Sequence, residues 1–97
     1  MVDPFNDQEV EKILKEIEED LRFCEENLKR EIRLDLTRHM LEEMMRNIDS
    51  LRTRRLPEAL HRRIGDLALK TRILYHRAEI LSSLKEEKSR YYRGWRV

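Results

Sequence analysis

Glycine and proline are scarce in this chain of 97 residues, which contains two of each. Neither occurs between Glu9 and Arg55. These residues are the usual signals of turns and loops, so the sequence excludes a fold of many short elements joined by long loops. We expect helices and little else, with no loop long enough to assemble an active site.

Cysteine and long hydrophobic runs are also lacking. Cys24 is the only cysteine, so the chain cannot form an internal disulfide, which is typical of a reducing compartment. No apolar stretch approaches the length needed to span a membrane. The N-terminus does not combine a basic segment with an apolar run, as a secretory signal does. These features predict a cytoplasmic protein.

Charge of one sign is not in excess, because the net charge is +1 although 42% of the residues are charged. This balance argues against a surface that binds nucleic acid or membrane as a whole. Acidic residues predominate up to Asp35 and basic residues after it, so we expect the first helix to lie against the later ones, within one chain or between two chains. A chain this short buries a limited share of its surface, which favours self-association or a hetero-complex over a monomer.

A first helix is predicted over residues 6–33. Asn6 and Glu9 form a capping-box pattern, and Phe5 and Val10 are spaced as a hydrophobic staple. The apolar residues of this segment alternate spacings of four and three, as in a coiled-coil seam. They are Val10, Leu14, Ile17, Leu21, Cys24 and Leu28.

A second apolar stripe begins out of phase with the first and predicts a second helix over residues 36–54. Its members are Thr37, Leu41, Met44, Ile48 and Leu51. The change of phase indicates a turn near residues 33–37. No glycine marks this turn, so one continuous helix over residues 6–54 is the alternative.

Pro57 suits the first position of a third helix, predicted over residues 57–90. Its main stripe comprises Leu60, Ile64, Leu67, Leu74, Ala78 and Leu81. A second apolar face comprises Leu69, Ile73, Ile80 and Leu84. A helix that is apolar over a wide arc usually touches two neighbours. Gly65, beside the main stripe, either permits a close helix crossing or is merely tolerated.

The pattern predicts a single all-α domain, an antiparallel three-helix bundle with coiled-coil-like packing. The alternative is a long two-helix hairpin that dimerises into a four-helix assembly. In the bundle the end of the third helix would overhang the other two. A basic and aromatic tail over residues 91–97 would follow it.

Enzyme chemistry finds little support in the sequence. Glu58 and His61 form a single Glu-x-x-His pair, whereas di-iron helical proteins need two such pairs and two further glutamates. Cys24 occupies a seam position, where cysteine behaves as a small hydrophobe. We predict no catalytic, cofactor or metal site and no small-molecule substrate.

Three groups of residues are candidates for binding a partner. Methionine is common both in cores and on adaptable binding surfaces, and arginines that bracket Pro57 gather positive charge at one bundle end. The C-terminal tail interleaves bases with aromatic residues, which protein interfaces favour. The candidates are Met40, Met44 and Met45; Arg52, Arg54, Arg55, Arg62 and Arg63; and Tyr91, Tyr92, Arg93 and Trp95.

The function predicted from these features is a non-enzymatic protein–protein interaction module. It would be an assembly or adaptor subunit that docks partners through its helix faces and its C-terminal end. The alternative is a small nucleic-acid-associated protein, in which the Arg52–Arg63 cluster and the Arg90–Arg96 tail hold single strands.

Overall fold

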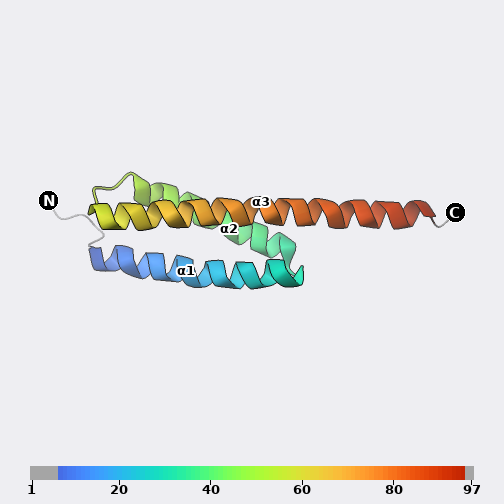
Figure 1. The fold of residues 1–97 in the computed structure, drawn as a ribbon, viewed down its shortest axis with the longest axis horizontal. Helices are drawn as coiled ribbons and strands as arrows, with labels where there is room; N and C mark the ends of the chain where they lie inside the picture. The colour runs from blue at the N-terminus through green and yellow to red at the C-terminus, as the bar shows by residue number, and fades with distance from the viewer. Residues whose placement is uncertain (1–6, 96–97) are drawn as a thin grey trace.

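Three helices form the molecule in a computed structural model that describes the backbone of residues 7–95 and the side chains of residues 7–86. They are α1 (Asp7–Arg30), α2 (Leu34–Arg52) and α3 (Glu58–Trp95). Each helix packs against the other two. Along the bundle, α1 and α3 run in the same direction and α2 runs back in the opposite direction (Figure 1). This arrangement confirms the three-helix bundle, and the alternative of one continuous helix over residues 6–54 is wrong.

The core lies along the common axis of the helices and consists mainly of the predicted stripes; Leu34 joins it, and Leu81 is only partly buried against it. Burying a large aliphatic side chain contributes about 1.5–3 kcal/mol, so these stripes supply most of the stability. The buried apolar residues are Val10, Leu14, Ile17, Leu21, Cys24, Leu28, Leu34, Leu41, Met44, Ile48, Leu51, Leu60, Ile64, Leu67, Leu74 and Ala78.

The turn between α1 and α2 ends α1 without glycine. Glu31 has a φ of 54°, and its N–H donates to the Leu28 carbonyl at 3.2 Å. The N–H of Ile32 donates to the Asn27 carbonyl at 3.0 Å. This is the Schellman pattern of helix ends, in which a left-handed residue usually is glycine. Arg33 is also left-handed, with a φ of 51°.

A buried hydrogen bond joins α1 to α2 close to this turn. The Asn27 side-chain amide donates to the Thr37 hydroxyl at 3.2 Å, and both residues are buried. A buried polar group needs such a partner, because an unpaired one costs about 1–3 kcal/mol. The pair therefore fixes how the two helices align.

The third helix continues beyond its predicted end. Residue 90 was the expected last residue, with a separate tail over residues 91–97, but α3 is helical to Trp95. A single glycine at position 94 does not prevent this, because glycine lowers helix propensity by only about 1 kcal/mol. The end of α3 extends past the ends of α1 and α2 (Figure 1), which agrees with the expected overhang. The bundle measures 69 × 20 × 19 Å.

Candidate protein-binding surface

Four aliphatic side chains of α3 face away from the core. We call them the outward stripe; their exposed fractions are Leu69 62%, Ile73 52%, Ile80 60% and Leu84 47%. At 3.6 residues per turn they fall on one side of the helix, opposite the buried face. From residue 69 to residue 84 this stripe runs for about 22 Å. An exposed apolar row of this length on one helix face is typical of a contact surface.

The side chains beside the outward stripe are charged. Arg72 lies on the edge of α3 that faces α2, where it lines a small cavity together with Asp49 and Arg52. His76 Nδ1 lies 3.3 Å from Glu79 Oε1 within α3. A shallow depression of about 460 Å³ is lined by His76, Glu79, Ile80, Ser83 and Leu84. The surface thus combines aliphatic side chains with opposite charges at its edge.

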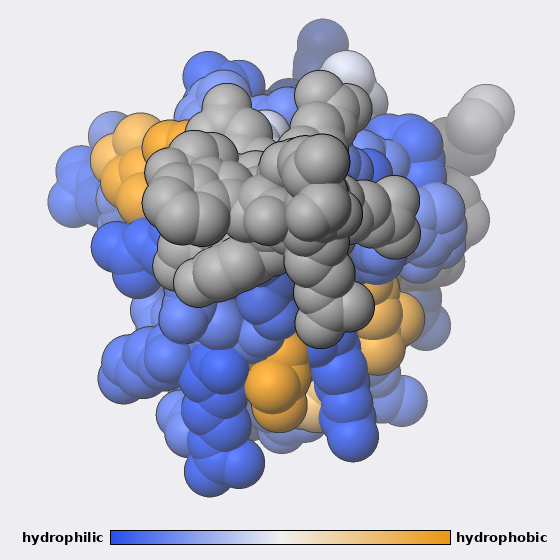
Figure 2. Space-filling view, turned by 90° about the vertical axis from the view of Figure 1, so that its right-hand side faces the viewer, coloured by the Kyte–Doolittle hydropathy of each residue, from blue (hydrophilic) through white to orange (hydrophobic). Residues whose placement is uncertain are grey.

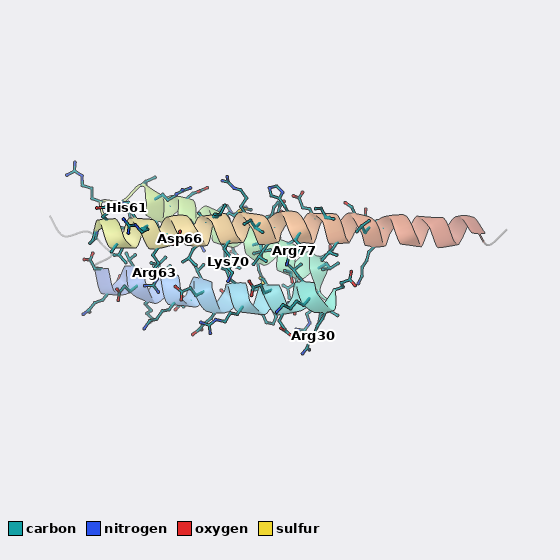
Figure 3. All side chains as sticks on the ribbon, viewed as in Figure 1. Arg30, His61, Arg63, Asp66, Lys70 and Arg77 are labelled. Carbon is teal, nitrogen blue, oxygen red and sulfur yellow. The ribbon has the colours of Figure 1, made fainter. Side chains whose placement is uncertain are left out.

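Ion pairs on the other edge of α3 hold α1. Arg63 binds Glu18 with its Nε at 3.0 Å and its Nη2 at 2.8 Å, and Lys70 Nζ lies 3.2 Å from Glu25. The second pair lies seven residues after the first on both helices, as expected for two helices that run in the same direction. In Figure 3 the labelled Arg63 and Lys70 lie on the side of α3 toward α1. Pairs of this exposure contribute at most about 1 kcal/mol each, and they set the alignment of α1 with α3.

Tyr75 connects α3 to α2. Its hydroxyl donates to Glu42 Oε1 at 3.1 Å. This hydrogen bond is the main cause that raises the pKa of Tyr75 above its ordinary value, with the charge of Glu79 among the smaller causes. Arg63 and Lys70 thus mark the side of α3 that contacts α1, and Tyr75 marks the side that contacts α2. The outward stripe occupies the remaining side.

The three predicted methionines do not form one surface. Met44 is 4% exposed and belongs to the core. Met40 is partly buried against the core, and Met45 lines the cavity beside Arg72. Met44 is therefore unavailable to a partner in the folded chain.

The predicted arginines lie around the α2–α3 connection and have different partners. Arg63 binds Glu18, and Arg62 Nη2 lies 3.8 Å from Glu58 Oε1 at an exposed site. Arg52 and Arg55 are exposed, and Arg54 is half-buried. The cluster is thus divided between internal contacts and solvent.

The side chains of the predicted C-terminal candidates, Tyr91, Tyr92, Arg93 and Trp95, lie outside the described residues.

A second depression lies where the α1–α2 turn meets α3. It has a volume of about 450 Å³ and is lined by Arg33, Leu34, Asp35, Leu36, Ser82, Lys85 and Glu86. Lys85 Nζ donates to the Glu31 carbonyl at 2.7 Å and so supports the left-handed turn.

Seen along the bundle from the end where α3 overhangs, hydrophobic patches lie among hydrophilic side chains (Figure 2).

Groups suited to chemistry are sparse among the side chains that the structure describes. Within residues 7–86, no three side chains of His, Cys, Asp or Glu are grouped so that they could hold a metal ion. Cys24 is buried, and this burial raises the pKa of its thiol to about 11. A thiol with a raised pKa and no access to solvent is a poor nucleophile. Among the described residues no helix is apolar enough over sufficient length to cross a membrane.

Comparison with known proteins finds no matching family model, no matching curated protein and no matching solved structure.

The outward stripe was visible in the sequence but was not among the predicted partner-binding residues. Its spacing was recognised as a second apolar face of the third helix. Both neighbouring helices instead pack on the other sides of α3, which leaves this face to solvent. Hydrophobic spacing identifies a face that can be buried but does not say whether the chain itself buries it.

Proposed function

We propose that this chain is a non-enzymatic protein–protein interaction module of the cytoplasm, an assembly or adaptor subunit that docks a helix of a protein partner on the outward stripe. The observation that carries the proposal is the exposure of Leu69, Ile73, Ile80 and Leu84 on one face of α3. Aliphatic residues spaced by four and seven match the way in which one amphipathic helix packs along another.

The energetics support this use of the surface. Each of the four side chains is about half exposed, so a partner that covered it would gain roughly 1 kcal/mol per residue. In the single chain, the exposed part of the stripe is in contact with water rather than with other apolar side chains. The overhanging end of α3 extends the same helix, and Tyr91, Tyr92, Arg93 and Trp95 are residue types that protein interfaces favour. We include this end in the proposed surface.

The test compares three chains purified from the cells that make the protein. Ile73→Lys with Ile80→Lys places two charges on the outward stripe. Glu16→Lys with Glu19→Lys, at exposed sites on α1, is the matched control. Native mass spectrometry should find a bound protein chain on the unmodified and control chains and none on the stripe variant. The same bound mass on all three would contradict the proposal.

The nucleic-acid alternative has a distinct outcome in the same experiment. If the cluster around Arg52 and Arg55 held nucleic acid, the bound mass would be removed by nuclease. Its affinity would fall steeply with salt. Both effects would persist in the stripe variant and disappear in Arg52→Ala with Arg55→Ala.

A further inference from the structure

The outward stripe is symmetric about its own midpoint. Leu69 and Ile73 are four residues apart, as are Ile80 and Leu84, with seven residues between the two pairs. The midpoint falls between His76 and Arg77. If a second α3 lay antiparallel on this face with a two-fold axis there, each leucine would meet the partner's other leucine. Each isoleucine would likewise meet the other isoleucine. A self-complementary face is what a two-fold dimer requires.

The length of α3 gives the same midpoint independently. The helix runs from Glu58 to Trp95, and the middle of this range also falls between His76 and Arg77. Two copies paired at that register would overlap along their whole length. The overhang of each α3 would then lie along the first half of the other. Any other register would leave one end of each α3 unpaired.

Charge complementarity supports the same pairing. Arg72 and Glu79 lie on the same edge of α3, at the fifth position before and the third position after the midpoint. In an antiparallel pair, like edges face each other, so Arg72 of one copy would lie about 3 Å along the axis from Glu79 of the other, close enough for two long side chains to meet. Such complementary charges fix orientation and register more than they add affinity.

The residues at the midpoint are polar. His76 and Arg77 interrupt the aliphatic stripe, and His76 already contacts Glu79. A polar position within an apolar seam lowers stability but specifies register, because any shift would set it against apolar side chains. The interruption therefore disfavours other alignments of two identical helices.

We propose that the partner on the outward stripe is a second copy of this chain, with the two α3 helices antiparallel and related by a two-fold axis between His76 and Arg77. This inference rests on the proposed function, since it names the helix that the stripe docks. The stripe symmetry and the helix midpoint each lead to the same register, and the edge charges are compatible with it.

Site-specific cross-linking tests the arrangement. His76→Cys places thiols close together at the axis, whereas Ser83→Cys places them about 20 Å apart in the antiparallel pair. A short bis-maleimide should join two chains of His76→Cys and should not join two chains of Ser83→Cys. Cys24 is fully buried, so the unmodified chain serves as the blank. Adding Ile73→Lys and Ile80→Lys to His76→Cys should abolish the product.

Each other outcome overturns the inference in a recognisable way. Cross-linking of both variants would mean a parallel pair, and cross-linking of Ser83→Cys alone would mean a different register. Failure of both variants to cross-link would mean that the stripe does not self-associate in this register. In that last case, the proposed function would still be supported if a different protein bound the unmodified chain and did not bind the chain with Ile73→Lys and Ile80→Lys. The proposed function and the homodimer can therefore fail separately.

Discussion

Gly65 lies inside α3 in a helical conformation that any residue can adopt. A Cβ built at this position meets no atom within 4 Å, so mere tolerance explains the glycine better than a close helix crossing. We predict that Gly65→Ala raises the free energy of unfolding by about 1 kcal/mol, because alanine restricts the unfolded chain and favours helix. Urea denaturation followed by circular dichroism measures this change. A decrease in stability would show that something packs closely at this site.

Cys24 makes stability depend on alkaline pH. Burial, followed by the charge of Asp20, raises the pKa of the thiol from 9.0 to about 11. The unfolded chain loses this proton near pH 9 and the folded chain keeps it to about pH 11. The contribution of the thiol is therefore complete below pH 9 and is lost as the pH rises from 9 to 11.

The free energy of unfolding of the unmodified chain should thus fall more steeply between pH 9 and pH 11 than that of Cys24→Ala. All other side chains are the same in both chains, so the difference isolates the thiol. Urea denaturation at a series of pH values provides the measurement. Equal slopes would mean that Cys24 is accessible to hydroxide in the folded chain.

Among the elements, the junction of α1 and α2 depends on the Asn27–Thr37 hydrogen bond. We predict that Thr37→Val lowers the free energy of unfolding by about 1–3 kcal/mol, because the Asn27 amide loses its acceptor while it stays buried. Adding Asn27→Leu should recover part of this loss, since both polar groups are then absent. Chemical denaturation of the unmodified chain, the two single variants and the double variant completes a double-mutant cycle. Additive losses would exclude coupling between the two residues.

The outward stripe should contribute little to the fold of a single chain. We predict that Ile73→Lys with Ile80→Lys changes the free energy of unfolding by no more than about 0.5 kcal/mol at concentrations where the chain is monomeric. Leu74→Ala, one residue away on the buried face, should cost about 2–5 kcal/mol. Thermal denaturation of dilute samples compares them. A large loss in the stripe variant would place these isoleucines in the core.

The helices and their buried faces were predictable because the sequence spaces apolar residues by three and four. Every residue of the first stripe is buried, and Pro57 marked the start of α3 to within one residue. The α1–α2 turn was placed only approximately, because Glu31 adopts the left-handed conformation that usually requires glycine. The predicted cap at Asn6 lies outside the described residues.

The candidate site was less predictable than the fold. Arg63 was proposed as a partner-binding residue and instead binds Glu18, as the uneven charge of the sequence had suggested for the acidic first helix. Met44 fills the core. The outward stripe could not be distinguished from a core face, because periodicity is the same whether the second neighbour belongs to the same chain or to another.

For the whole molecule, the shape of the particle in solution distinguishes the proposed arrangement from others. A single chain measures 69 Å along its longest axis. Most of that length is α3, which at 1.5 Å per residue runs for about 57 Å, so two copies paired antiparallel about its midpoint double the mass without lengthening the particle. An end-to-end pair would be far longer.

Small-angle X-ray scattering of the unmodified chain therefore tests the central claim most directly, because it yields mass and maximum dimension together. The account predicts twice the 12.0 kDa mass of one chain with a maximum dimension close to 69 Å. A mass of one chain at every concentration, or a two-chain particle much longer than one bundle, would contradict it.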